Sequence, residues 1–277
     1  MFSSDQLKDI RTAHEHGVRP EGAPVAKGKQ MQLTVVGSGD AFGSGGRSNT
    51  CFRLDSGGHT LVVDFGASAL VAWNRLGLAT VDIDAVAISH LHGDHFGGLP
   101  FLLLECQFVS ARTKPLTILG PKGLRARLEM ASEALFPGMW ANRWSYPLTI
   151  VEMGPGEAKE IPGFQVSALE VKHPSGAIAT ALRVDNGTKV FAYSGDTAWV
   201  ENLVRISDRA DLFIVECYSG DKPIPNHIDW PTLKANLPKL NARRIMVTHM
   251  GATALARRDE IAAAGLQIAE DGNILHV

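Results

Sequence analysis

The segment from His90 to His95 constrains this 277-residue chain more than any other part of it. Its sequence, HLHGDH, holds four nitrogen or oxygen donors within six residues and directly follows the apolar run AVAIS. In a strand, residues two apart share a face, so His90 and His92 are expected to point to one side at the strand's C-terminal end. The turn at Gly93 would then bring Asp94 and His95 to the same region. Such a donor set suits zinc or a similar first-row divalent ion, although any single histidine is ordinarily a plain polar residue.

Three further donors stand at the ends of predicted strands. His173 closes the run ALEVKH, Asp196 follows VFAYSG, and His249 closes RRIMVTH. Site residues gather where buried strands leave a sheet, so these three are candidates for the site of residues 90–95. Taken singly, two have plainer interpretations: Asp196 as the N-cap of a helix that starts at Ala198, and His173 as a surface turn residue.

Short β-branched runs bounded by Gly, Asp or Asn recur from Met31 to the final run LQIAEDGNILHV, and they predict about a dozen strands. Apolar residues at helical spacing predict helices over residues 66–77, 99–108, 124–135, 230–240 and 257–264. Two groups of strands separated by helices indicate one layered α/β or α+β domain over residues 31–277. Residues 1–30, with a short amphipathic pattern and a Pro/Gly/Lys-rich passage, are interpreted as an N-terminal extension.

The composition is that of an ordinary globular protein, with 45% hydrophobic and 20% charged residues and a formal net charge of −2. This balance does not point to a long polyanion such as DNA as a partner. The three cysteines show no CxxC spacing, so they suggest neither a disulfide framework nor a Cys-rich zinc site. The N-terminus lacks the apolar core of a signal peptide, and no stretch reaches about 18 uninterrupted apolar residues. We therefore expect a cytoplasmic protein with no membrane partner.

From about Met31 to its C-terminus the chain resembles the metallo-β-lactamase superfamily of metallohydrolases. The resemblance is carried by HLHGDH, the later His173, the Asp of SGDT and the His of THM. It implies a four-layer αββα sandwich with two divalent metal ions at the sheet edges. The implied ligands are His90, His92 and His173 for the first ion and Asp94, His95 and His249 for the second, with Asp196 bridging the two. Asp64, in LVVDFG, matches the superfamily's acidic residue near the site and would orient a ligand histidine.

Within that superfamily the chain is most similar to the branch of ribonuclease Z, arylsulfatase and cyclic-nucleotide phosphodiesterase. The shared features are VVGSGDAFGSGGRSNT, the form HLHGDHFGGLP, and Glu216 with His227 upstream of His249. In ribonuclease Z-like proteins a Glu and a His in these places form a proton-handling pair near the metals. The alternative is that His227 caps or lines the helix predicted to start beside it.

The resemblance implies hydrolysis at a binuclear centre. Two nearby divalent ions lower the pKa of a bridging water and neutralise charge on phosphoryl oxygens. Zinc is the expected metal, with manganese, iron or nickel as alternatives. With two divalent ions bound by five neutral histidines and two carboxylates, the site has a net positive charge, which favours a small anionic ester. We expect a metal-bridging hydroxide to attack small phosphodiesters, cyclic nucleotides among them, or aryl sulfate or phosphonate esters. The expected catalytic residues are Asp94, His227 and Glu216, with His227 as the acid for the leaving alkoxide.

Two alternatives to this function come from different classes of protein. A ribonuclease Z-like RNA endonuclease is the first, but relatives that mature transfer RNA generally carry a long arm between the third ligand His and the bridging Asp. Here Asp196 follows His173 by only 23 positions, which two strands and a DNG turn fill. Nucleic acid is therefore not the expected partner. The second alternative is a non-catalytic metal-binding scaffold, which the complete ligand set disfavours. A homodimer is an option, since many relatives are dimers.

Three residues are candidate substrate contacts. Arg47 is the charged residue suited to an anionic ester in the glycine-rich loop of residues 37–49, whose backbone N–H groups would cradle a phosphate. The plainer interpretation of that loop is a tight hairpin connection. Trp140 and Trp144 belong to the aromatic-rich segment 136–147, interpreted as a lid or substrate wall on which a base or aryl group would stack. Packing in the core or in a dimer contact is the alternative for these rings.

Overall fold

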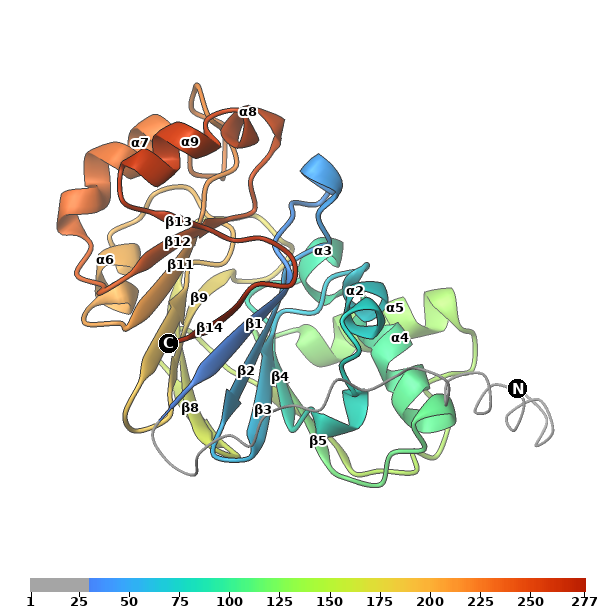
Figure 1. Ribbon diagram of the computed structural model, residues 1–277. Helices are drawn as coiled ribbons and strands as arrows, with labels where there is room; N and C mark the ends of the chain where they lie inside the picture. The colour runs from blue at the N-terminus through green and yellow to red at the C-terminus, as the bar shows by residue number, and fades with distance from the viewer. Residues whose placement is uncertain (1–29) are drawn as a thin grey trace.

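Two seven-stranded sheets pack face to face in the computed structural model, which describes residues 30–277 (Figure 1). The first sheet has the order β14-β1-β2-β3-β4-β5-β6. Its strands are β1 (Gln32–Gly37), β2 (Cys51–Ser56), β3 (His59–Val63), β4 (Ala85–Ala87), β5 (Leu116–Gly120), β6 (Leu148–Glu152) and β14 (Ile274–His276). Strands β3 to β6 run parallel, and β14, β1, β2 and β3 pair antiparallel.

The second sheet has the order β13-β12-β11-β10-β9-β8-β7. Its strands are β7 (Ala158–Ile161), β8 (Phe164–Glu170), β9 (Thr180–Asp185), β10 (Val190–Tyr193), β11 (Leu212–Glu216), β12 (Ile245–Thr248) and β13 (Gln267–Ile268). Strands β10 to β13 run parallel and β7 to β10 antiparallel. The parallel parts of both sheets bring the carboxyl ends of several strands to one edge, and this edge carries the candidate site.

Helices cover the outer face of each sheet (Figure 1). Against the first sheet lie α2 (Ala69–Arg75), α3 (Gly93–Phe96), α4 (Leu99–Leu104), a π-helical turn η3 (Glu105–Val109) and α5 (Leu124–Leu135). Against the second sheet lie α6 (Asn202–Ser207), α7 (Trp230–Asn236), α8 (Ala252–Leu255) and α9 (Arg258–Ala263). Short 3-10 turns are η1 (Ser44–Gly46), η2 (Thr80–Asp82) and η4 (Leu237–Lys239).

Alternation within the strands explains the layering. In β3, Leu61 and Val63 face the other sheet, whereas Val62 faces the helices, as the two-residue period of a strand requires. One apolar cluster therefore fills the space between the sheets, and one lies under each helical layer. Strands buried on both faces read as nearly continuous apolar runs, which is why the sequence reveals them. The predicted four-layer αββα sandwich is confirmed.

The strands that were not predicted correctly are short. The strand β7 has the sequence AKEI with exposed and half-buried residues in alternation, and no strand was predicted there. The final run, LQIAEDGNILHV, is not one strand: β13 pairs with β12 in the second sheet and β14 with β1 in the first. Between them Asp271 accepts hydrogen bonds from the backbone N–H groups of Ser38 and Ser48. The C-terminal turn therefore holds the glycine-rich loop in place.

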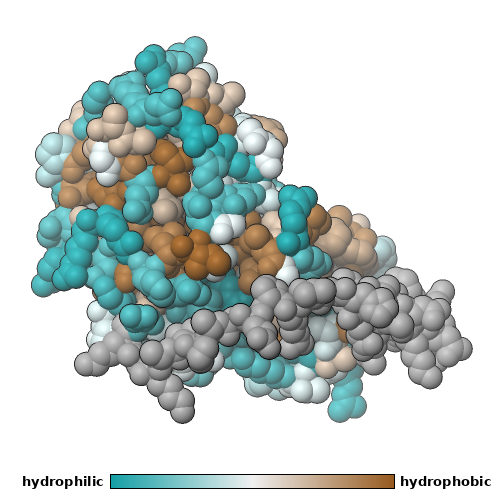
Figure 2. Space-filling model, viewed as in Figure 1, coloured by the Kyte–Doolittle hydropathy of each residue, from teal (hydrophilic) through white to brown (hydrophobic). Residues whose placement is uncertain are grey.

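The N-terminal extension predicted for residues 1–30 lies, apart from Gln30, outside the described residues. Within residues 30–277 no helix has the length and apolar character needed to cross a membrane. On the face shown in Figure 2, hydrophobic atoms form several groups separated by hydrophilic side chains.

Arg112 ties the first sheet to the loops below it. Its side chain is buried and donates to five backbone carbonyls, those of Thr80, Val81, Ile83, Lys114 and Pro115. Its guanidinium carbon also lies 5.8 Å from the ring centroid of Tyr146. A single arginine therefore joins residues 80–83 to residues 114–115, and the Ile83 carbonyl is a buried group that it satisfies.

We expect Arg112→Ala to lower the free energy of unfolding by about 3–5 kcal/mol, because five buried or partly buried hydrogen bonds and the packing of a fully buried side chain are lost at once. Urea unfolding followed by circular dichroism measures the change. The exposed Arg125 on α5 provides the control, and Arg125→Ala should stay within about 0.5 kcal/mol of the wild type. Equal stabilities for the two variants would contradict this role of Arg112.

Candidate metal centre

The seven predicted metal ligands converge at one edge of the two sheets, each in a segment that follows the carboxyl end of a strand. His90, His92, Asp94 and His95 follow β4, His173 follows β8, Asp196 follows β10 and His249 follows β12. Two backbone features support this placement. Gly195 has a φ of 59° and a Cβ there would lie 2.7 Å from the Thr180 carbonyl oxygen, so only glycine fits the turn before Asp196. His249 itself has a φ of 56°, a left-handed conformation that is uncommon for residues other than glycine and is enriched at functional sites.

The sequence predicted that His90 and His92 share one face of a strand, and this prediction is wrong. The strand β4 ends at Ala87, and both histidines lie in the loop before α3. The chain leaves the strand early because the Ser89 N–H donates to the Asp64 carboxylate at 2.7 Å. The two rings still meet edge to face, with centroids 5.0 Å apart. The predicted convergence is therefore correct, although the strand argument for it is wrong.

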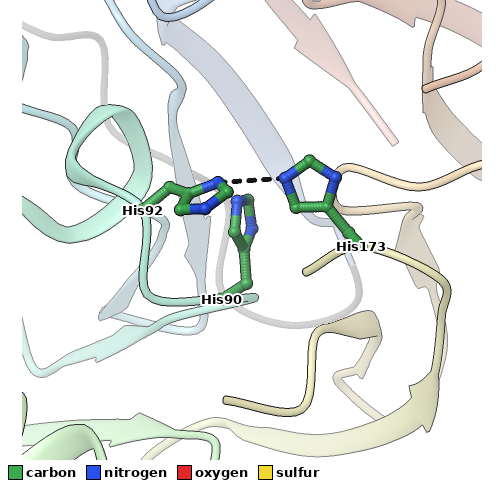
Figure 3. A group of neighbouring side chains, drawn as sticks. All are labelled: His90, His92 and His173. Atoms are coloured by element: carbon green, nitrogen blue, oxygen red, sulfur yellow. Dashed lines mark hydrogen bonds between the residues drawn. The ribbon is translucent and has the colours of Figure 1, made fainter. Parts of the chain in front are cut away.

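The first donor group consists of His90, His92 and His173 (Figure 3). One nitrogen from each ring lies within 4.8 Å of the others. Nδ1 of His92 and Nε2 of His173 face each other at 2.9 Å, the contact marked by the dashed line. The other nitrogen of His173, Nδ1, is 3.0 Å from the backbone carbonyl of Asn226, which fixes the orientation of the ring.

The second donor group consists of Asp94, His95, Asp196 and His249. Oδ2 of Asp196 lies 3.3 Å from Nε2 of His95 and 3.2 Å from Nε2 of His249. The same oxygen lies 3.8 Å from Nε2 of His90 and 4.0 Å from Nε2 of His173, in the first group. Asp196 is therefore placed between the two groups, where a ligand shared by two ions would have to be.

Unpartnered buried atoms show that these residues fit a cation. Nε2 of His90, Nε2 of His95 and Oδ1 of Asp196 are buried without a hydrogen-bond partner in the described part of the chain. Buried polar atoms are nearly always paired, and leaving one unpaired costs about 1–3 kcal/mol. Convergent nitrogen and carboxylate donors with unused lone pairs are what a zinc-like ion binds.

At two of the ligands, His90 and Asp196, the electrostatics favour the protonation states that a metal requires. Burial, together with the neighbouring histidines, lowers the pKa of His90 well below its usual range. Burial opposes ionisation of Asp196, but the facing histidines, His249 foremost, outweigh it and hold the pKa of that carboxyl well below its usual range. A neutral imidazole and an ionised carboxylate are the forms that bind metal. At His95 the electrostatics do not favour the neutral form: burial lowers its pKa, but the charges of three carboxylates, Asp196 foremost, outweigh burial and raise that pKa, so a metal would have to displace a proton there.

Asp64 lies directly behind His95. Its buried carboxylate accepts from the backbone N–H and the hydroxyl of Ser89, and Oδ2 is 2.7 Å from Nδ1 of His95. Burial raises the pKa of Asp64, while the contact with His95 opposes that rise. The hydrogen bond at Nδ1 leaves Nε2 of His95 to face the donor group. The structure thus brings Asp64 to the position that its predicted role requires.

Glu216 and His227 form a pair beside the donor groups. Glu216 ends β11, is fully buried, and accepts from the backbone N–H of Thr197 at 2.5 Å. Nδ1 of His227 lies 3.1 Å from Oε1 of Glu216. The alternative that His227 caps the following helix is wrong, because Asp229 is the N-cap of α7 and accepts from the Thr232 N–H. Burial lowers the pKa of His227, but the hydrogen bond and charge of Glu216 outweigh it and raise that pKa to about 9.

A small pocket of about 280 Å³ opens onto the donor groups. Its lining combines site residues with apolar and aromatic ones: Ala41, Phe42, His92, Asp94, His173, Asp196, Tyr218, Ile224, His227 and His249. Among the described residues, neither a lysine nor an arginine lines it. Phe42, Tyr218 and Ile224 are not among the residues predicted from the sequence. A signal existed for Phe42, since a phenylalanine inside a glycine-rich loop belongs to no predicted strand or helix.

The three predicted substrate contacts lie elsewhere. Arg47 pairs with Glu270 at 2.7 Å, and its side chain is only 10% exposed. Trp140 and Trp144 pack against the apolar cluster under the helices of the first sheet, with ring centroids 6.2 Å apart. The described lining of the pocket includes none of these three residues. The core-packing alternative for the two tryptophans is the one that the structure shows.

Several backbone N–H groups of the glycine-rich loop already donate to carboxylates of the protein. The N–H groups of Phe42 and Ser44 donate to Oδ1 of Asp40, and those of Ser38 and Ser48 donate to the Asp271 carboxylate. These four donors are therefore not available to cradle a phosphate. The loop acts instead as a braced support for the Phe42 side chain.

Fold and donor set together are those of the metallo-β-lactamase fold, and the chain is similar to ribonuclease Z proteins of that fold. A family model narrows the class. Residues 31–274 match the model described as anti-Pycsar protein Apyc1, and the chain belongs to that family.

Individual relatives agree with this class. A ribonuclease Z of Methanosarcina acetivorans is 28% identical over 152 residues, which cover 55% of this chain and 48% of that protein. The chain thus spans about half the length of this relative. Among solved structures, the metallo-β-lactamase fold protein YhfI of Bacillus subtilis has a TM-score of 0.73 at 20% identity and covers 90% of this chain and 100% of its own. A diphosphatase of the PhnP family has a TM-score of 0.70 at 20% identity, over 88% of this chain and 97% of its own. At 20% identity, the likeness to these two structures shows a shared fold and no more.

Proposed function

We propose that the protein is a metal-dependent hydrolase of small phosphodiesters, with cyclic nucleotides and aryl phosphodiesters as candidate substrates. The observation that carries the proposal is the convergence of seven His and Asp donors beside one pocket of about 280 Å³, which five of them line together with His227, the partner of the buried Glu216. A pocket at the lower end of the usual size range for small ligands suits a small ester. Aryl sulfate and phosphonate esters offer the same chemistry in a similar volume.

Two divalent ions, zinc expected, would be held by the two donor groups, with Asp196 between them. When bound, they supply Lewis-acid chemistry, which lowers the pKa of a coordinated water and neutralises charge on the phosphoryl oxygens. Manganese, iron and nickel suit the same donors. Asp64 would keep His95 in the tautomer that binds metal, and Asp94 would serve as ligand and catalytic carboxylate.

His227 would donate the proton that the leaving oxygen needs. Its Nδ1 faces Glu216, so Nε2 is the nitrogen left for the pocket. A pKa of about 9 keeps the imidazole protonated at neutral pH. The proton on Nε2 passes to the departing alkoxide, the ester P–O bond breaks, and a neutral alcohol leaves. Glu216 stabilises the charged imidazole before the transfer and fixes its orientation.

We expect Glu216→Gln to move the alkaline limb of the kcat profile to lower pH. A general acid works only while protonated, so activity falls as pH rises through its pKa. Without the Glu216 charge, the pKa of His227 should fall from about 9 toward or below the ordinary histidine value of about 6.5. Measurement of kcat between pH 5 and about 10 tests this shift. An unmoved alkaline limb would show that another group titrates there.

An RNA endonuclease is the second candidate function. The match to a ribonuclease Z supports it and weighs against the expectation that nucleic acid is not a partner. Two observations favour the small ester. The interval between His173 and Asp196 forms the hairpin β9–β10, which leaves no length for a protruding arm. The described lining of the pocket also offers no cationic side chain for neighbouring phosphates of an RNA strand.

Metal analysis followed by a substrate panel tests the proposal. The panel contains bis(4-nitrophenyl) phosphate, a 3′,5′-cyclic nucleotide, 4-nitrophenyl sulfate, a thioester and a precursor transfer RNA, each with zinc- and with manganese-loaded protein. We expect turnover of the phosphodiesters by protein that binds two ions per chain. Cleavage of the RNA alone would establish the endonuclease, and cleavage of the thioester alone would refute both. Metal binding without turnover of any substrate would support the scaffold alternative.

Cytoplasmic location and a homodimer stay predictions.

A further inference from the structure

We infer that Phe42 and Tyr218 form an aromatic wall that binds a planar ring of the substrate, so that the site selects phosphodiesters that carry an aryl or nucleobase group. The inference rests on the proposed function and extends it to a specificity determinant. The two rings, with Ile224, supply the apolar part of a pocket whose remaining lining is metal ligands and His227, apart from Ala41.

Phe42 is exposed at 83%, the largest value among the exposed large hydrophobic side chains of the described residues. A phenylalanine left in water forgoes about 1.5–3 kcal/mol of burial free energy. Such an exposed ring is a natural contact for a ligand when it lines a pocket, and Phe42 does so.

The loop around Phe42 is braced, so its exposure is built into the fold. The Asp40 carboxylate accepts from the N–H groups of Phe42 and Ser44 at 3.3 and 2.8 Å and from the Ser44 hydroxyl at 2.7 Å. The Asn49 amide donates to the Asp40 carbonyl at 2.9 Å. These bonds hold the ring out of the core without help from its own side chain.

The same loop is joined to the metal centre. The backbone N–H of His249 donates to the carbonyl of Ser38 at 3.1 Å, and the Thr248 hydroxyl donates to that carbonyl at 3.2 Å. Farther along, η1 packs against α8, where a Cβ on Gly45 would lie 3.0 Å from Cδ1 of Leu255. Phe42 is therefore held at a fixed place relative to a metal ligand.

Tyr218 is held as firmly at another part of the pocket. Its ring stacks on the ring of His227, with centroids 4.9 Å apart and planes inclined by 30°. Further neighbours are the ring of His249, with centroids 6.1 Å apart, and Gly251, where a Cβ would lie 3.2 Å from Cε2 of Tyr218. The Tyr218 ring therefore lies next to the proposed acid, where a ring attached to the reacting ester would be.

The lack of lysine and arginine side chains in the described lining of the pocket also favours an uncharged ring. The pocket lining has no lysine or arginine among the described residues, and the arginines of the nearest loops are paired, Arg47 with Glu270 and Arg257 with Asp221. The described lining therefore offers no lysine or arginine side chain to a second phosphate on the substrate. An uncharged planar ring, by contrast, finds two aromatic faces, and stacking on such faces tolerates many ring types.

Two diesters with one leaving group test the inference: phenyl 4-nitrophenyl phosphate and methyl 4-nitrophenyl phosphate. We expect the wild type to prefer the phenyl ester, and Phe42→Ala to reduce the ratio of the two kcat/KM values about tenfold, mainly through KM. Phe42→Trp should keep the preference, because it keeps an aromatic face. Phe101→Ala is the matched control, since Phe101 is a half-exposed phenylalanine on α4 that packs on Phe136 and does not line the pocket.

An unchanged ratio in Phe42→Ala, or an equal loss for both esters at an unchanged thermal midpoint, would overturn the inference and leave the proposed function standing. If the wild type hydrolyses neither ester, the proposed function fails for these substrates, and calorimetric titration of metal-loaded protein decides the inference separately. Phenyl phosphate should then bind about tenfold more tightly than methyl phosphate to the wild type and lose that advantage in Phe42→Ala. Equal affinities in the wild type would overturn it.

Discussion

Replacement of His227 by alanine is expected to lower kcat about 100- to 10,000-fold while both metal ions stay bound. The imidazole meets Glu216 through Nδ1 and lines the pocket beside the donor groups, but it is proposed as an acid and not as a ligand. The loss should depend on the leaving group. An alkoxide cannot depart without a proton, whereas 4-nitrophenolate is stable as an anion, so the variant should be impaired more with alkyl leaving groups. Steady-state kinetics with both kinds of ester and metal analysis of the same samples measure the effect.

His276→Ala is the control for His227→Ala, because His276 is an exposed histidine on β14. It should retain kcat within about twofold. A His227→Ala protein with wild-type kcat would remove this residue from the mechanism. A variant that loses metal along with activity would instead identify His227 as a ligand, which its grouping with His173 and Asp196 allows geometrically.

The convergence of the seven candidate ligands could be predicted because their signal is local. Four of the seven lie within six residues, and the other three each follow a buried apolar run. Strand ends in layered folds meet at one edge, so no knowledge of the partners was needed to place these residues together. The pairing of the two donor groups, with Asp196 within 4.0 Å of histidines from both, could be inferred only through the family resemblance.

Which of the other side chains line the pocket could not be predicted, because distant partners fix their positions. Arg47 looks free in the sequence, but Glu270, 223 positions away, binds it. The destination of Trp140 and Trp144 depends on the apolar surface that the helices leave open. Phe42, in contrast, was not predicted to line the pocket and does so. It belongs to no predicted element, and it stays exposed because Asp40 and Asp271 hold its loop. In each case a long-range contact decides whether the residue reaches the pocket.

Asp64→Asn is expected to weaken metal binding about 10- to 100-fold and to empty the second donor group before the first. The Asp64 carboxylate contacts Nδ1 of His95 through Oδ2, while Oδ1 accepts from the Ser89 N–H. In asparagine, Oδ1 would keep the Ser89 bond and an NH₂ group would face His95. A donor at that place requires Nδ1 of His95 to be the acceptor, which puts the proton on Nε2, the nitrogen that faces Asp94 and Asp196. A protonated Nε2 cannot bind a metal.

The substitution isolates this effect because asparagine tolerates the backbone conformation. Asp64 has a φ of 56°, where aspartate and asparagine are the least strained side chains after glycine. Asp84→Asn is the matched control: Asp84 is also buried and lies 3.6 Å from a histidine, His59, but it precedes β4, whereas residues 90–95 of the donor groups follow that strand. Metal content after dialysis against graded chelator should fall toward one ion per chain in Asp64→Asn and stay at the wild-type value in Asp84→Asn. Retention of both ions at wild-type affinity in Asp64→Asn would show that the tautomer of His95 is set by the metal and not by the carboxylate behind it.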